Sequence, residues 1–187
     1  MTNISPYTPV DNLGLQVTLS LPATPVLTTD EAKKACYIDF SDDDTEIDDL
    51  ITSATEWVQR KLNRALITQT VVAEWDSVGY RVVLPYAPIQ SITSVQTVDD
   101  DGTLTTVTDY YFRNGIIKYT TSVGLRVTYV AGYGDNASDV PQPIRTAIER
   151  IVKSMYDRRD DEVQETNIDK LEFNAMALLR PYIYVRS

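Results

Sequence analysis

A change in hydrophobic period divides this chain and limits the elements that it can form. From Ile67 to Val130 the sequence runs as short β-type segments separated by turns, whereas the sequence on both sides repeats its apolar residues at helical spacing. A segment of period two does not make a stable helix, and a segment of helical period does not make a stable strand. We therefore expect helices before and after one β-region, an order typical of the α+β class.

The strongest helical pattern precedes the β-region and predicts a helix over about 44–64. Acidic residues crowd its first turns, and Lys61 and Arg64 lie near its end, as the helix macrodipole favours. Its apolar residues form one stripe: Ile47, Leu50, Ile51, Ala54, Val58 and Leu62. An amphipathic helix must bury such a stripe, so this helix is expected to contribute to the core.

Three further helices are expected. Thr28 and Glu31 have the capping-box spacing, which predicts a short helix over about 28–37. A helix over about 141–158 begins at two prolines, and a short one over about 170–179 is ended by Pro181. The stripe of the third helix, expected to face that of the second in one core, comprises Ile144, Ala147, Ile148, Ile151, Val152 and Met155.

The β-region contains one strong hairpin signal. Asn114-Gly115 separates two β-type runs, and this pair is preferred in type I′ turns because both positions need positive φ. Pro85 and Pro88 cannot lie in a central ladder and are expected to mark a corner between strands. The predicted fold is an α-helical bundle of about four helices, with a small antiparallel sheet inserted between the second and third helices.

The expected domain organisation has three parts. Residues 1–27 carry four prolines and no sustained helical period, which indicates an extended N-terminal arm. Residues 28–180 are expected to form a single domain, and residues 181–187 a docking tail.

Composition excludes several classes of function. The 187-residue chain has no histidine, so Ser-His-Asp catalysis, Cys-His catalysis and imidazole metal sites are impossible. The lone cysteine, Cys36, lies in a helical pattern and is interpreted as a small buried residue rather than a reactive thiol. No run of apolar residues is long enough for a membrane span, and no secretory signal is recognised. We expect a protein that folds in a reducing cytoplasm, with no membrane partner.

The charge balance argues against tight binding of nucleic acid. Seventeen basic residues stand against 27 acidic ones, giving a net charge of −10. Phosphate contacts require clustered Lys and Arg, so a surface of this sign favours at most transient, non-specific passage of DNA.

No motif for catalysis, cofactor or metal emerges. The glycines of YVAGYGDNASD, from Tyr129 to Asp139, lack the Gly-Lys-Ser/Thr ending of a phosphate loop, and Pro141 and Pro143 remove N–H donors that such a loop would use. The acidic runs Ser41–Asp49 and Asp99–Gly102 do not have the ligand spacing of a calcium hand. We predict no enzyme activity and no cofactor.

Six segments follow one another over roughly residues 26–183: TTDEAKKACYID, EIDDLITSATEWVQRKLNRAL, TQTVVAEWD, VVLPYAPIQSITSVQTVDDDG, YVAGYG…VPQPIRTAIERIVKSMYDRRDD and ALLRPYI. In this order they resemble the head–tail connector (head-completion adaptor) proteins of tailed bacteriophages. The more specific parts are LPYAPIQSITSV and the joint from AGYG to VPQPI.

The resemblance implies a structural role in the virion. Such proteins form a ring of about a dozen copies below the portal, lengthen the DNA channel and offer a platform to the tail. The implied partners are further copies of the chain, the portal protein and a tail, tail-terminator or stopper protein, and the implied location is the head–tail interface. The family brings no catalytic or cofactor residues.

Two groups of residues are predicted to make the contacts of such a ring. The net charge suggests an acidic or neutral channel wall, with these candidates: Asp42, Asp43, Asp44, Asp160, Asp161 and Glu162. The apolar and aromatic C-terminus is predicted to dock on the portal or a neighbouring copy through Tyr182, Ile183, Tyr184 and Val185. A tail that folds back on its own sheet stays an open alternative.

A second class of function also stays open. The chain could be a small monomeric or dimeric enzyme, or a ligand-binding α+β domain of unknown substrate. Particle mass and co-assembly with a portal protein distinguish it from a ring adaptor.

Overall fold

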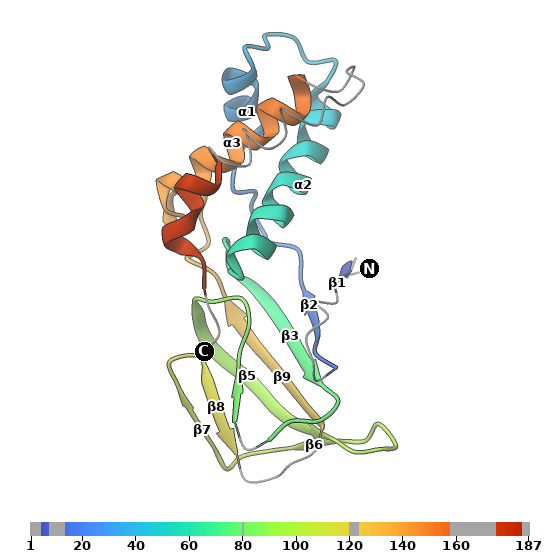
Figure 1. Cartoon of the computed structure of the whole chain (residues 1–187). Helices are drawn as coiled ribbons and strands as arrows, with labels where there is room; N and C mark the ends of the chain where they lie inside the picture. Colours follow the sequence, from blue (N-terminus) through green and yellow to red (C-terminus); the bar gives the residue numbers. More distant parts are fainter. Residues whose placement is uncertain (1–4, 8–13, 80, 120–123, 158–174, 185–187) are drawn as a thin grey trace. The chain divides into compact units, whose positions relative to one another are not determined.

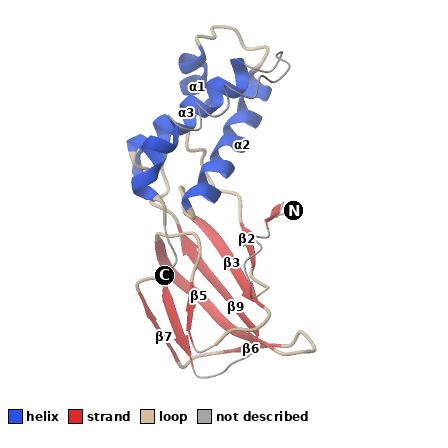
Figure 2. Ribbon diagram, viewed as in Figure 1, coloured by secondary structure: helices blue, strands red, loops and turns tan. Residues whose placement is uncertain are grey.

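The computed structural model describes residues 5–7, 14–79, 81–119, 124–157 and 175–184. The chain divides into two compact units, which we call the β-unit and the helical unit (Figures 1 and 2). The β-unit is Met1–Ala23, Arg64–Tyr133 and Tyr184–Ser187, and the helical unit is Thr24–Asn63 and Gly134–Ile183. Each unit therefore combines segments that lie far apart in the sequence.

The helical unit contains α1 (Thr29–Cys36), α2 (Asp44–Leu62) and α3 (Gln142–Asp157), with a further helical stretch at residues 175–179. Short 3₁₀ turns lie at η1 (Ala137–Asp139) and η3 (Arg180–Tyr182). The capping box predicted for Thr28 and Glu31 is confirmed at the start of α1. The helices α1, α2 and α3 pack against one another.

The predicted apolar stripes are largely, but not wholly, buried. Ile51 and Val58 of α2 and Ile148 of α3 are buried, whereas Leu50 is only half-buried. The placement of Met155 in the core is wrong, because its side chain is 38% exposed in the last turn of α3. The following residue makes the contact at that turn instead: the Tyr156 hydroxyl donates a hydrogen bond to the Asp43 carboxylate.

The β-unit contains two antiparallel sheets. The six-stranded sheet has the order β1-β2-β3-β9-β5-β6, and the three-stranded sheet has the order β4-β8-β7. The strand bounds are β1 Ser5–Tyr7, β2 Gln16–Leu19, β3 Gln69–Trp75, β4 Arg81–Val83, β5 Ile89–Val98, β6 Leu104–Thr106, β7 Tyr110–Arg113, β8 Ile116–Tyr119 and β9 Gly124–Ala131. The predicted corner at Pro85 and Pro88 is confirmed, since it separates β4 from β5.

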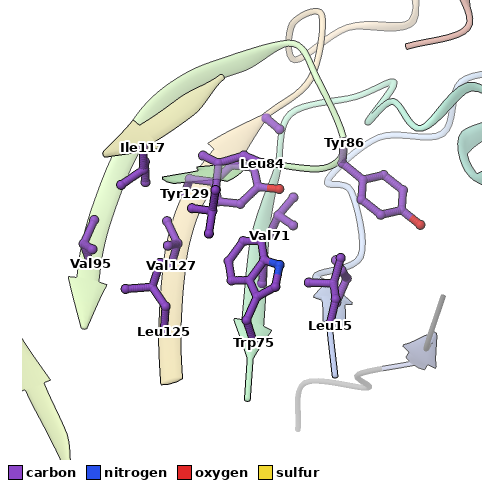
Figure 3. Packing of buried hydrophobic residues seen from close by; sticks show 14 of the residues in the cluster. Leu15, Val71, Trp75, Leu84, Tyr86, Val95, Ile117, Leu125, Val127 and Tyr129 are labelled. Carbon is purple, nitrogen blue, oxygen red and sulfur yellow. The ribbon is translucent and has the colours of Figure 1, made fainter. Parts of the chain in front are cut away.

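The two sheets share one hydrophobic core (Figure 3). Trp75 of β3, Val95 of β5 and Val127 of β9 come from the larger sheet, and Val82 of β4 and Ile117 of β8 from the smaller one. Strands that alternate buried and exposed residues bury one face in this way, so each sheet covers the other. The buried Tyr129 hydroxyl donates to the carbonyl oxygen of Pro85, which satisfies its polar atom.

The predicted fold class, an α-helical bundle with a small inserted sheet, is wrong. The strands form a two-sheet unit with its own core, and the helices do not form a bundle around it. The sheet is not a simple insertion either, because β2 precedes the first helix and pairs with β3. The physical reason is that alternating strands bury their apolar faces against a second sheet and leave the helical stripes to pack on one another.

The predicted hairpin at Asn114-Gly115 is confirmed. It joins β7 to β8, and φ is 51° at Asn114 and 75° at Gly115, as a type I′ turn requires. Tyr111 lies opposite Lys118 in this ladder.

Candidate interaction surfaces

The glycine-rich joint after β9 makes backbone contacts that serve the fold. The amide of Gly132 donates to the Pro88 carbonyl at 3.0 Å, and the amide of Tyr133 donates to the Leu66 carbonyl at 3.0 Å. A Cβ at Gly132 would lie 2.5 Å from the backbone nitrogen of Thr68, so the glycine permits a close approach of two backbone segments. These amides are already paired, which agrees with the structural interpretation of this segment.

The acidic residues at the start of α2 make an ion pair with α1 and accept a hydrogen bond from α3. The Lys33 ammonium of α1 lies 2.7 Å from the Asp44 carboxylate, and the Tyr156 hydroxyl of α3 donates to Asp43. Asp43 occupies the N-cap position without a side-chain capping bond, so its carboxylate is used between helices instead. Of these predicted channel residues, Asp42 is exposed, whereas Asp43 and Asp44 are half-buried. Asp160, Asp161 and Glu162 lie outside the described residues.

The predicted docking tail has two parts with different environments. Tyr182 and Ile183 belong to the helical unit, where Ile183 is 36% exposed. Tyr184 belongs to the β-unit, and the Arg64 guanidinium lies 5.8 Å from the centroid of its ring. Val185 lies outside the described residues.

Arg64 links Tyr184 to the β-unit by a double aromatic contact. Its guanidinium lies 5.8 Å from the Tyr133 ring as well as 5.8 Å from the Tyr184 ring. The Tyr184 hydroxyl also reaches the hairpin turn, since a Cβ built at Gly115 would lie 2.9 Å from it. The structure thus brings Tyr184 against its own sheet unit, whereas Ile183 is partly exposed.

Exposed apolar side chains mark surfaces that sequence reasoning missed. In the helical unit, Tyr37 is 89% exposed and Phe40 is 47% exposed. Tyr37 ends α1 in the left-handed conformation, with φ of 60°, a position where glycine or asparagine is preferred. The Lys153 ammonium lies 5.2 Å from its ring centroid. The available signal was the position of Tyr37 at the end of the predicted helix, where a bulky aromatic residue is unusual.

In the β-unit the exposed apolar residues are Leu21, Leu104 of β6 and Tyr111 of β7. The last two lie on strands at the ends of their sheets. Edge strands carry unpaired backbone groups, so these positions are candidates for contacts with other chains.

Among the described residues, no group of three or more Cys, Asp or Glu side chains is placed to hold a metal ion. Cys36 is buried, and burial raises the pKa of its thiol, which keeps it in the unreactive protonated form. Within the same residues, no helix has the length and hydropathy needed to cross a membrane.

Comparison with protein families identifies one match. The family model described as "Head completion protein" matches residues 25–169, which is most of the chain. The comparison with curated proteins gave no match.

Comparison with solved structures finds chains of the same fold, among them three from gene transfer agent particles. The chain in the neck of an empty gene transfer agent (GTA) particle, computed with C6 symmetry, has a TM-score of 0.71 and 19% identity over 90% of this chain and 96% of that chain. A chain in the virion of the native GTA particle has a TM-score of 0.71 and 20% identity, and the match covers 90% of this chain and 96% of that chain. A chain in the neck of the native particle, computed with C12 symmetry, has a TM-score of 0.59 and 21% identity. This match covers 78% of this chain and 90% of that chain.

Proposed function

We propose that this chain, which belongs to the head completion protein family, forms a ring adaptor that joins the portal of a phage-like head to its tail. The family match over residues 25–169 carries this proposal, and it establishes a structural role in connecting head and tail. The virion neck is the corresponding location.

The ring arrangement is supported by the fold. The similar chains come from necks computed with C6 and C12 symmetry, in which each copy repeats around one axis. A cyclic ring needs two different surfaces on each copy, one for each neighbour. The separate β-unit and helical unit offer distinct exposed surfaces for this purpose.

The proposed partners are further copies of this chain, the portal protein on the head side and a terminator or stopper protein on the tail side. DNA would pass through the ring without being held. The net charge of −10 supports such a conduit, because phosphate groups would not be attracted to an acidic or neutral wall. Asp42, just before α2, is exposed and is the candidate for that wall among the predicted channel residues that the structure describes.

Co-assembly with the portal protein of the same particle tests the function. The expected result is a closed ring of this chain on the portal, seen by electron microscopy and by the added mass in light scattering. A chain that never joins portal or particle, while binding a small ligand, would overturn the proposal.

The charge of the wall is tested in the same assembly. A ring whose channel is lined mainly by Lys and Arg would contradict the acidic conduit, even if the ring itself forms. Asp42→Lys is expected to leave assembly intact and to slow DNA ejection from assembled particles, because it adds a ring of positive charge. An ejection rate equal to that of the unchanged particle would show that Asp42 does not line the channel.

A further inference from the structure

Strand β7 (Tyr110–Arg113) is the open edge of the three-stranded sheet. It pairs with β8 on one side, and no other strand of the described chain pairs with its second side. Tyr110 and Phe112 pack against the core of the β-unit, whereas Tyr111 is 56% exposed. The edge therefore presents backbone groups to solvent beside an exposed aromatic face.

The ladder settles which backbone groups point outward. In a hairpin with a two-residue turn, the flanking pair, here Arg113 and Ile116, is hydrogen-bonded, and pairs then alternate along the strands. The Leu84 amide donates to the Gly115 carbonyl at 2.8 Å. This bond confirms that the backbone amides and carbonyls of Gly115 and Ile117 point toward β4, while those of Ile116 and Lys118 point toward β7. The amides and carbonyls of Tyr110 and Phe112 consequently point away from β8, toward the open edge.

Two other strand edges of the β-unit carry features that discourage pairing. Strand β1 contains Pro6, which lacks an amide donor. Strand β5 has register shifts between Ile89 and Ser91 and between Ile92 and Ser94, in the part that β6 does not cover. Strand β7 has neither proline nor register shift, so it is a better template for an added strand than β1 or the uncovered part of β5. It is also longer than the edge strands β4 and β6, which have three residues each.

The sequence around β7 is complementary to itself. The run DYYFR, from Asp109 to Arg113, carries opposite charges at its two ends, and both charged residues are exposed. When two such strands are laid antiparallel about Tyr111, Asp109 of each copy lies opposite Arg113 of the partner subunit. The same register sets the outward groups of Tyr110 opposite those of Phe112 of the partner subunit. Backbone pairing and charge pairing thus agree in one register.

We propose that β7 binds β7 of a second copy of this chain as an antiparallel pair, with Tyr111 opposite Tyr111 of the partner subunit. This pair has a two-fold axis, whereas a cyclic ring relates each copy to the next by a rotation about the ring axis. The pairing therefore belongs to the chain before ring assembly, and it covers the open edge in that state. It does not depend on the proposed function.

Charge reversal with the full-length chain tests this register. Sedimentation velocity of the unchanged chain is expected to show a concentration-dependent monomer–dimer equilibrium. Asp109→Lys or Arg113→Glu alone should raise the dimer Kd about tenfold, because the two-fold axis places like charges together twice. The double variant Asp109→Lys/Arg113→Glu should return the Kd to within about threefold of the original, because the opposite charges are restored.

A cysteine at the centre of the pair gives an independent measurement. Residues opposite each other in a non-hydrogen-bonded pair have Cα atoms about 4.5 Å apart, which a disulfide can span. Tyr111→Cys should therefore give a disulfide-linked dimer under mild oxidation. Thr105→Cys, exposed on the β6 edge, is the matched control and should stay monomeric, as should the unchanged chain with its buried Cys36.

The outcomes separate this proposal from the ring. A chain that is monomeric at all concentrations, a double variant as weak as the single ones, or a Thr105→Cys chain that links as readily as Tyr111→Cys would overturn the β7 pair. Pairing of β7 with a different strand of a ring neighbour would appear as no rescue by the double variant. Failure to assemble on the portal would instead count against the ring adaptor and leave the β7 pair standing.

Discussion

At the scale of single residues, Glu31 connects the start of α1 to α3. Its carboxylate accepts a hydrogen bond from the Thr28 amide at 2.9 Å and lies 2.7 Å from the Arg145 guanidinium. The bond from the Thr28 backbone, and then Arg145, lower the pKa of Glu31 below its ordinary value. A carboxyl group with a lowered folded pKa stabilises the fold above its unfolded pKa, and this contribution is lost as the pH falls through the folded pKa.

We therefore predict that Glu31→Gln lowers the free energy of unfolding by about 0.5–1 kcal/mol at pH 7, since the pair is partly exposed. The difference from the unchanged chain should vanish well below the unfolded pKa of about 4.3. Urea unfolding at several pH values measures both effects, with Glu149→Gln on α3 as the control. A difference that stays constant down to pH 3 would contradict the linkage.

Gly115 is constrained twice, by its positive φ of 75° and by the Tyr184 hydroxyl beside it. Gly115→Ala is expected to destabilise the chain by about 1–2 kcal/mol, since a Cβ is strained in this conformation and meets Tyr184. Gly79→Ala is the matched control, because no atom lies within 4 Å of a Cβ there and no positive φ is found. Thermal melting of the two variants should separate them clearly, and equal melting temperatures would exclude both constraints.

At the scale of elements, the apolar residues of α2 and α3 differ in burial, so truncating them should cost different amounts of stability. Ile51→Ala is expected to cost about 2–5 kcal/mol, because its side chain is buried and truncation leaves a cavity. Leu50→Ala should cost less, since Leu50 is half-buried, and Met155→Ala should cost under about 1 kcal/mol. Reversible urea unfolding gives the order. A loss at Met155 as large as that at Ile51 would show that α3 buries its last turn.

At the scale of the whole molecule, neighbouring C-terminal residues are expected to have different roles: one binds a partner and the next stabilises the fold. We propose that Ile183 docks on the portal or on a neighbouring copy, whereas Tyr184 is held by Arg64 in the β-unit. Ile183→Asp should then abolish portal binding and leave the melting temperature unchanged, because the side chain is exposed. Tyr184→Ala should lower the melting temperature, since the ring loses its contact with Arg64.

The paired variants also identify the opposite case. Retained portal binding by Ile183→Asp, together with a lowered melting temperature, would mean that Ile183 stabilises the fold of its own chain and does not bind the portal. Deletion of residues 182–187 combines the two effects and is the less specific variant.

The sequence by itself determined the local elements. The capping box at Thr28, the stripe from Ile47 to Leu62, the proline corner and the Asn114-Gly115 turn all follow from short-range rules of hydrogen bonding, periodicity and allowed φ. The family resemblance and the structural role were also accessible, because they rest on the order of these motifs.

Only the tertiary structure decided which surfaces meet. The sequence indicated only an extended arm for residues 1–27, and the pairing of β2 with β3 joins segments some fifty residues apart. The same holds for the two sheets that cover each other, for the contact of Tyr184 with Arg64, and for the partial exposure of Met155. An apolar face must be buried somewhere, but its period does not name the partner, because hydrophobic attraction is not directional. That choice is made by the packing of all elements together, and here it separated strands from helices instead of placing one small sheet inside a bundle.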